Sequence, residues 1–544
     1  MNAVKINING IVQGVGFRPF IYRLAKKHGL AGWVLNSSQG VEIHAQGRPE
    51  DIGLFLSQIK SELPPQALID ALDVFPAESG DYKDFVIRES LNSDGVTRIS
   101  PDIALCSDCL AEMLDEKDRR YLYPFINCTN CGPRFSIIQN TPYDRPLTSM
   151  AGFTMCPDCQ KEYDDPEDRR FHAQPNACPA CGPKVWLCGR DGKATAERTK
   201  AMTKAAELLL AGEILAIKGI GGFHLACDAG NDAAIKKLRD RKHRPDKPLA
   251  LMCWSLDDAR SICEVSDSEG KVLGSSQSPI VLLQKSNIKN KILNISDIVA
   301  PGNNYLGVML PYAPVHHLLF RELKKLKPDL NALVMTSGNV QDEPVVTGNQ
   351  EALNRLAGLA DHFLLNDRDI ENRNDDSIVF VPGAENQPFD RGFGRLSPAA
   401  QGKKSKSRKQ NNQESLSNEN QPVVQIIRHS RGYAPNPIIL PVSVPPTLAV
   451  GGEMKNVFCL ASGNKAYLSQ YIGEMDNTAT LEFFSEMVKK YQKWFRIKPE
   501  VIVHDLHPDY ASSALARALP GRKIAVQHHA AHALSVAAER GLAG

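Results

Sequence analysis

The chain has 544 residues, more than a single hydrophobic core usually organises, so three or four domains are expected, in a multidomain α/β and α+β protein. Its 64 Lys and Arg residues nearly balance its 62 Asp and Glu residues, so the total charge gives no indication of nucleic-acid binding. The start MNAVKINING lacks the features of a signal peptide, and no apolar run approaches the ~18 residues needed to cross a bilayer. We therefore predict a cytoplasmic protein that binds neither membrane nor nucleic acid.

The first predicted elements are a strand over residues 4–11 and an amphipathic helix over residues 17–27, joined by a glycine-rich turn. Such a turn presents backbone N–H groups together with the positive end of the helix dipole, so it can bind an anion. Arg18, on the first turn of the helix, can add a bidentate contact. On its own, the loop is equally compatible with a purely structural turn.

The stretches GIVQGVGFRPF and GWVLNSSQGVEIHAQG resemble acylphosphatases, small enzymes that hydrolyse carboxyl phosphate anhydrides. The resemblance implies a ferredoxin-like βαββαβ domain over residues 1–91, ending with the strand-like FVIRE. It also implies that Arg18 holds the phosphoryl group and that Asn36 positions the attacking water. The implied phosphate-binding loop is Gln13, Gly14, Val15 and Gly16. These roles suit a reaction that needs charge stabilisation and an oriented nucleophile.

Two copies of one cysteine-rich repeat, 50 residues apart, predict a tandem four-cysteine zinc-finger module over residues 98–190. Each copy carries two Cys-x-x-Cys pairs, and two pairs supply the four thiolates that tetrahedral Zn²⁺ prefers. A complete ligand set predicts two structural zinc ions, and the simplest arrangement is one in each repeat, although the spacing also permits pairing between repeats. A redox or disulfide role is the less favoured alternative. The predicted ligands are Cys106, Cys109, Cys128, Cys131, Cys156, Cys159, Cys178 and Cys181.

An α/β domain is predicted over residues 198–440, with a helix at 205–212 followed by the apolar strand and glycine bend of ILAIKGIGGFHLACDA. The cations of LRDRKHRPDKPLALM could form a solvated helix face, but the prolines and the strand that follow favour a fixed phosphate site. This run and ALVMTSGNVQDEP resemble the Lys-x-Arg and Ser-x-Asn motifs of the YrdC/Sua5 family of carbamoyl-adenylate-forming domains. The resemblance implies that ATP, with Mg²⁺, and a carbamate are bound by Lys242, Arg244, Lys247, Ser337 and Asn339.

An insertion over residues 383–421 interrupts this resemblance. It has almost no apolar side chains, so it cannot bury enough surface to order itself, and we predict a disordered loop. Its Lys and Arg cluster is either a solvated spacer or a contact site.

The last predicted domain, residues 447–544, has a helix at 477–494 and ends with VQHHAAHALSVAAERGLAG. His528 and His532 share a helix face, a spacing that suits a metal, although two histidines so spaced are more often simply packed or exposed. The segment resembles the Kae1-like domains of the actin-like (ASKHA) class, which implies a further divalent metal at these histidines. The chain stops just after this helix, so we expect a truncated first lobe, an incomplete ligand set and an impaired final transfer.

The order of these four parts resembles the HypF family, the carbamoyltransferases of [NiFe]-hydrogenase maturation. That resemblance implies a relay in which carbamoyl phosphate is hydrolysed, ATP converts the carbamate to carbamoyl-AMP, and the carbamoyl group passes to the C-terminal cysteine of HypE as a precursor of the iron cyanide ligand. A tRNA-modifying enzyme of the threonylcarbamoyladenosine type would not need the first two domains. A zinc-finger nucleic-acid adaptor would need a basic face, whereas the repeats are rich in Asp and Glu.

Overall fold

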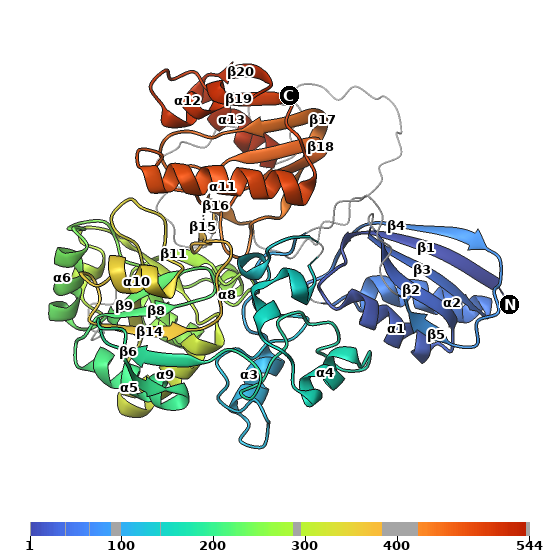
Figure 1. Cartoon of the computed structure of the whole chain (residues 1–544), viewed down its shortest axis with the longest axis horizontal. Coiled ribbons are helices and arrows are strands. Elements are labelled where there is room, and N and C mark those ends of the chain that lie inside the picture. The colour runs from blue at the N-terminus through green and yellow to red at the C-terminus, as the bar shows by residue number, and fades with distance from the viewer. Residues whose placement is uncertain are drawn as a thin grey trace, which may run out of the picture.

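The computed structural model describes residues 2–37, 40–64, 66–88, 99–141, 143–286, 295–382 and 423–539. Figure 1 shows the cysteine-rich module between the amino-terminal domain and a large α/β domain, with the carboxy-terminal domain above the α/β domain. The insertion predicted at 383–421 lies outside the described residues. Within the described ranges, no helix combines the length and apolar character that a bilayer crossing requires.

The amino-terminal domain is a five-stranded sheet of order β4-β1-β3-β2-β5 with two helices. Helix α1 has the predicted bounds because Phe17, Ile21 and Leu24 recur on one face and are buried. The strand predicted in FVIRE is β5, which pairs in parallel with β2 at one edge, whereas β4 completes the βαββαβ unit. The elements are β1 (Asn2–Ile11), α1 (Phe17–Lys27), β2 (Ala31–Ser37), β3 (Gly40–Gly47), α2 (Pro49–Ser61), β4 (Leu68–Ala77) and β5 (Phe85–Ile87).

The cysteine-rich module consists mostly of turns and short helices. Each copy of the repeat has one helix, α3 (Ser107–Leu114) or α4 (Pro157–Asp164), whose N-cap is the first cysteine of that copy. The segment between the copies forms the 3-10 turns η1 (Phe135–Ile137), η2 (Arg145–Leu147) and η3 (Ser149–Gly152). With so little regular structure, the module would gain much of its folding energy from a metal bound by its cysteines.

The α/β domain is built on an eleven-stranded mixed sheet of order β16-β15-β11-β12-β10-β13-β9-β8-β14-β6-β7. The central strands β8 (Leu215–Lys218) and β9 (Phe223–Asp228) are buried along their whole length, as expected for strands covered on both faces. The sheet takes in β6 (Val185–Cys188) and β7 (Ala194–Glu197), so it begins before residue 198, within the span that the sequence assigned to the zinc module.

The other strands of this sheet are β10 (Leu251–Cys253), β11 (Ile280–Gln284), β12 (Tyr305–Met309), β13 (Ala332–Ser337), β14 (His362–Asn366), β15 (Ile378–Phe380) and β16 (Gln425–Arg428). The domain also contains α5 (Arg198–Leu210), α6 (Asp232–Arg241), α7 (Leu256–Ile262), α8 (Asp267–Leu273), η4 (Asp297–Val299), α9 (Pro314–Leu326) and α10 (Asn349–Arg355). Helix α5 begins earlier than the predicted 205–212 helix.

The carboxy-terminal domain packs the long helix α11 (Thr478–Phe495) on a four-stranded sheet of order β18-β17-β19-β20. Asn477 caps α11 by accepting a hydrogen bond from the Thr480 N–H, and the buried face of the helix carries Phe484, Tyr491 and Trp494. The remaining elements are β17 (Pro437–Ala449), β18 (Cys459–Leu468), β19 (Val501–Asp505), α12 (Ala511–Ala518), β20 (Arg522–Val526) and α13 (His528–Glu539).

One short segment, residues 134–138, contacts the three other domains. Arg134 Nε donates to the Gly14 carbonyl of the first domain at 3.4 Å. The Phe135 ring lies edge-on to Trp494 of the last domain, with ring centroids 6.0 Å apart. Asn372 of the α/β domain donates to the carbonyls of Phe135 and Ile138, each at 2.7 Å. We call residues 134–138 the junction segment.

Candidate functional site

The eight predicted cysteine ligands form two clusters, and each cluster comes from one copy of the repeat. In the first, neighbouring sulfur atoms lie 3.6 to 3.9 Å apart, and in the second 3.6 to 3.7 Å apart. A tetrahedral zinc with Zn–S bonds of ~2.3 Å separates its sulfurs by about 3.8 Å, whereas a disulfide would bring them to ~2.05 Å. The residues therefore fit one zinc ion in each repeat, which answers the pairing question that the spacing left open.

Each repeat contributes an arginine to the other repeat's cysteine cluster. Arg169 of the second copy donates to Cys109 Sγ at 2.6 Å, and Arg119 of the first copy donates to Cys159 Sγ at 3.3 Å. Burial opposes the charge of Arg169, but the nearby sulfurs of Cys128 and Cys109 raise its pKa. Both arginines belong to an Asp-Arg-Arg triplet that the two copies share, at 118–120 and 168–170. The sequence does not show that the arginines of each copy contact the cysteines of the other.

The next arginine in each copy, Arg120 or Arg170, forms an ion pair with a glutamate of the other copy. Arg120 forms an ion pair with Glu162 at 2.5 Å, and Arg170 pairs with Glu112 of the first copy. Burial by itself would raise the pKa of Glu162, but hydrogen bonds from Arg120 and Arg119 lower it to about 2. The two clusters are therefore held in one network of charge-assisted contacts.

The phosphate-loop candidates of the first domain are brought together with Asn36. Gly14 and Gly16 have φ of 70° and 72°, left-handed conformations that favour glycine. Gln13 Nε2 donates to the carbonyls of Ser37 at 2.8 Å and Gly40 at 2.7 Å, which fixes the loop beside the end of β2. Val15 is buried beneath the loop, in the core of this domain.

Arg18 and Asn36 occupy the two elements that meet at this loop. Arg18 is half-buried on the first turn of α1, and burial lowers its pKa although Asp144 and Tyr163 act in the opposite direction. The Asn36 Oδ1 atom is buried without a hydrogen-bond partner among the described residues. A buried amide oxygen of this kind needs a donor such as water, the role assigned to Asn36 from the sequence.

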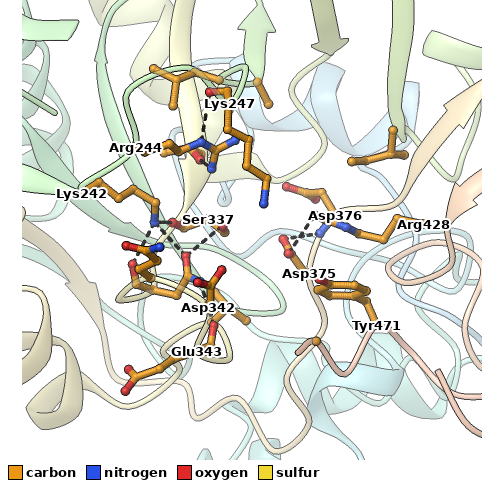
Figure 2. A pocket seen from close by; sticks show the side chains of 18 of the residues that line it. Lys242, Arg244, Lys247, Ser337, Asp342, Glu343, Asp375, Asp376, Arg428 and Tyr471 are labelled. Carbon is orange, nitrogen blue, oxygen red and sulfur yellow. Dashed lines mark hydrogen bonds and ion pairs between the residues drawn. The ribbon is translucent and has the colours of Figure 1, made fainter. Parts of the chain in front are cut away.

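The predicted ATP and carbamate residues line a cavity of about 390 Å³. Lys242 Nζ donates to the carbonyls of Ser337 and Asn339 and to Asn339 Oδ1, each at 2.8 Å. Arg244 Nη1 donates to Thr336 Oγ1 at 3.4 Å, and Figure 2 shows the Lys247 side chain ending in the open space. All five predicted residues are thus placed around one pocket.

Burial and mutual repulsion lower the pKa values of Lys242, Arg244 and Lys247. Burial, helped by the charge of Arg244, lowers the pKa of Lys242 to about 7. Burial likewise lowers the pKa of Arg244 to about 10 and shifts the pKa of Lys247 downward. Three crowded, desolvated cations form a site whose charge a polyphosphate would balance.

The opposite wall of the cavity includes residues that the sequence did not single out. Arg428 pairs with Asp375 at 2.9 Å, and the Tyr471 ring lies 4.5 Å from the Arg428 guanidinium (Figure 2). Tyr471 and Glu474 belong to the carboxy-terminal domain, so two domains enclose the pocket. Only the docking of the domains brings Tyr471 to this wall, so no local sequence signal identified it.

The buried ion pair of Arg431 and Asp376 stabilises this wall of the cavity. Arg431 Nε donates to Asp376 Oδ1 at 2.7 Å, and His224 Nε2 lies 2.8 Å from Asp376 Oδ2. The Arg431 guanidinium also lies 3.4 Å from the centre of the Tyr312 ring. Burial opposes the charge of Asp376, but Arg431 and His224 together lower its pKa. The network holds the loop that carries Asp375.

The predicted histidine pair lies on α13 with its nitrogens facing each other. His528 Nε2 and His532 Nε2 are 3.1 Å apart, and His528 Nδ1 lies 2.6 Å from Asp505 Oδ2 at the end of β19. The two Nε2 atoms could share one cation while Asp505 orients His528, the usual carboxylate–histidine arrangement of metal sites. Asp505 thus lies directly against the predicted histidine pair.

Comparison with known families covers most of the chain. Residues 4–87 match the acylphosphatase family, and residues 105–138 and 155–188 match the HypF finger. Residues 207–392 match the Sua5/YciO/YrdC family, described as telomere recombination, and residues 443–539 match the HypF Kae1-like domain. This combination defines a multidomain class with an acylphosphatase domain, two cysteine fingers, a YrdC-like domain and a Kae1-like domain.

Two relatives match nearly the whole chain, and a third matches only its first domain. Carbamoyltransferase HypF2 of Cupriavidus necator is 44% identical over 99% of this chain and 64% of its own length. A crystal structure of full-length HypF in a phosphate- and nucleotide-bound form superposes with a TM-score of 0.85 at 43% identity, over 100% of this chain and 65% of that one. The acylphosphatase of Thermotoga petrophila is 42% identical over 89 residues, 98% of its length.

The chain belongs to the HypF family. It spans about 64% of the length of the curated HypF relative that it matches.

Proposed function

We propose that this chain carries out the carbamoyl-activating steps of a carbamoyltransferase of [NiFe]-hydrogenase maturation. The observation that supports this most directly is the cavity that Lys242, Arg244 and Lys247 share with Tyr471 and Glu474. A cationic pocket enclosed by both domains suits an adenylate intermediate. The YrdC-like domain would form this adenylate, and the Kae1-like domain would use it. The name carbamoyltransferase, carried by the relative from Cupriavidus necator, agrees with this assignment.

In the first step, Arg18 and the N–H groups of the glycine loop bind the phosphoryl group of carbamoyl phosphate. Asn36 holds a water whose oxygen attacks phosphorus as the bond from phosphorus to the bridging oxygen breaks. The products are carbamate and inorganic phosphate, with one proton released. The loop and the arginine stabilise the charge that develops on the phosphoryl oxygens.

In the second step, a carbamate oxygen attacks the α-phosphorus of ATP, and pyrophosphate leaves. The product is carbamoyl-AMP. Lys242, Arg244 and Lys247 would hold the phosphates, Ser337 and Asn339 would position the acyl group, and Mg²⁺ would accompany the nucleotide. Desolvation in an enclosed pocket would protect both unstable species from water.

In the last step, an acceptor thiolate attacks the carbamoyl carbon, and AMP leaves with the electrons of the carbon–oxygen bond. The acceptor in this proposal is the C-terminal cysteine of HypE, whose thiocarboxamide is the precursor of the iron cyanide ligand. His528 and His532 would hold a divalent metal near this step. All thirteen cysteines of the chain are unpaired, which suits a reducing, cytoplasmic setting.

ATP–pyrophosphate exchange by the purified chain, measured with and without carbamoyl phosphate, tests the first two steps. We expect exchange only with carbamoyl phosphate, and we expect Arg18→Ala and Lys242→Ala each to abolish it. Glu207→Gln, which removes an exposed carboxylate on α5, is the matched control and should exchange normally. Exchange that needs no carbamoyl phosphate, or that survives Arg18→Ala, would contradict the relay.

A further inference from the structure

The glycine loop of the first domain rests directly on the cysteine-rich module. A Cβ atom at Gly16 would lie 2.9 Å from Thr129 Oγ1, so the loop and the module approach each other as closely as glycine allows. Thr129 lies inside the Cys-x-x-Cys turn at 128–131, which supplies half of the first cysteine cluster. The candidate phosphate loop is therefore packed against a predicted zinc turn.

Arg134 connects this turn to the loop. Its buried side chain donates to three backbone carbonyls: Nε to Gly14 at 3.4 Å, Nη1 to Gly132 at 3.1 Å and Nη2 to Thr129 at 2.5 Å. Asp102 accepts a hydrogen bond from the backbone N–H of Arg134 at 2.8 Å, but within the described ranges no carboxylate forms an ion pair with the guanidinium. The guanidinium charge is therefore not cancelled by contact and can attract an anion bound in the loop.

The hydrogen bond to the Gly14 carbonyl also sets the orientation of a loop N–H group. The peptide bond between Gly14 and Val15 is trans, so the Val15 N–H points in the direction opposite to that carbonyl, away from Arg134. No described residue accepts a hydrogen bond from the N–H of Gly14, Val15 or Gly16. These N–H groups are therefore available to an anion, and Arg134 fixes the direction of one of them.

We infer that Arg134 is a positioning residue of the acylphosphatase site, which holds the peptide between Gly14 and Val15 so that the Val15 N–H donates to the phosphoryl group. The inference rests on the proposed phosphate site of the first domain. The match to the acylphosphatase family covers residues 4–87, so Arg134 is supplied from outside the domain that carries the loop. The cysteine-rich module thus helps to shape the phosphate site of its neighbour.

The test uses Arg134→Lys in the full chain, because lysine keeps the charge but its single nitrogen cannot reach all three carbonyls. We expect the Kd for inorganic phosphate, measured by calorimetry, and the KM for carbamoyl phosphate each to rise by about tenfold, the effect of losing one N–H contact to a charged group. The kcat should stay within about twofold, because Arg18 and Asn36 are unchanged. Only phosphate binding that Arg18→Ala abolishes is counted, since the cationic cavity of the α/β domain would also bind phosphate.

Arg145→Lys is the matched control. Arg145 is also a buried arginine of the module, and its three acceptors are the carbonyls of Phe153, Gln174 and Asn176, all within the module. This variant should lower the thermal unfolding midpoint but leave the Kd for phosphate within about twofold, because none of its contacts reaches the glycine loop.

A merely structural role of Arg134 predicts a different result. It would reduce the folded fraction and so lower kcat, while the KM and the Kd of the folded molecules stayed the same. That result, or an equal rise of the Kd in Arg145→Lys, would overturn the inference. Zinc content shows whether each variant folds, and Arg134→Gln carries the same expectation if Arg134→Lys does not fold.

Failure of the proposed function is distinguishable from failure of this inference. An unaltered chain that binds phosphate in an Arg134-dependent way but does not hydrolyse carbamoyl phosphate would overturn the proposed first step and leave the role of Arg134 standing. An unaltered chain without Arg18-dependent phosphate binding would overturn both.

Discussion

Arg169 Nη2 donates to Cys109 Sγ at 2.6 Å, although the two residues belong to different copies of the repeat. Arg119 makes the reciprocal contact with Cys159. A guanidinium beside a zinc-bound thiolate offsets part of the negative charge of a four-thiolate site, so a zinc ion held by either cluster would depend on a residue of the other repeat.

We therefore expect Arg169→Ala to weaken zinc binding in the first repeat, by about 10- to 100-fold, the usual effect of losing an outer-shell partner. Zinc release to a chelator, followed with a colorimetric indicator, should show one fast and one slow ion per chain. Arg119→Ala should likewise release one ion early, from the second repeat. Lys117→Ala, an exposed cation of the same module, is the control. Two ions that leave Arg169→Ala at the unaltered rate would show that the contact carries no such role.

ATP binding should depend on the protonation of Lys242, whose pKa burial lowers to about 7. Below pH 7 the Lys242 side chain is a charged ammonium. Above pH 7, without ATP bound, it loses its proton, so ATP binding at higher pH requires Lys242 to take up a proton. The Kd for ATP should rise by up to about tenfold per pH unit between about pH 7.5 and 9, above the ionisation range of phosphate. Calorimetry in buffers of different ionisation enthalpy would detect the proton uptake directly.

Lys242→Ala should bind ATP weakly and should lose most of this pH dependence. An unaltered chain whose Kd for ATP stays constant over the same interval would contradict the assignment of a low pKa to Lys242.

Tyr471 should contribute to nucleotide binding although it lies in the carboxy-terminal domain. Its ring lies over Arg428, which pairs with Asp375 on the pocket wall. Tyr471→Ala should raise the Kd for ATP by roughly three- to tenfold through loss of the cation–π contact, whereas Tyr471→Phe should be close to neutral. Equal effects of the two substitutions would instead point to the hydroxyl group.

Replacing only one member of the buried ion pair between Arg431 and Asp376 should strongly destabilise the folded protein. Either Arg431→Met or Asp376→Leu leaves an uncompensated buried charge, for which about 3–5 kcal/mol is typical. The double variant removes both charges, so its thermal unfolding midpoint should lie above that of either single variant. A midpoint for the double variant below that of Asp376→Leu would show that the hydrogen bonds from Arg431 to the Gln277 and Ser278 carbonyls outweigh the cost of its unpaired charge.

Local features were predictable from the sequence where residues close in the chain decide them. The apolar spacing of α1 gave its bounds, and the Cys-x-x-Cys spacing predicted two metal clusters. Asn477, one residue before α11, was assigned to the helix because capping residues and first-turn residues look alike in a periodic pattern. Such errors are confined to the ends of elements.

Features that depend on how distant segments meet were not predictable in this way. The position of β5 beside β2 depends on sheet pairing across the whole first domain. The crossover of Arg119 and Arg169 depends on how the two repeats pack together, and the place of Tyr471 depends on domain docking. Periodicity and spacing carry no information on these contacts.

The junction segment, residues 134–138, bears on how the length of such chains can vary. A one-residue insertion there would displace Arg134 from Gly14, or Phe135 from Trp494, and so would disturb several domain boundaries at once. An insertion in the exposed turn at Asp191–Lys193, between β6 and β7, would disturb none of them. Evolutionary changes of length should therefore collect at hairpin turns and linkers and avoid this segment.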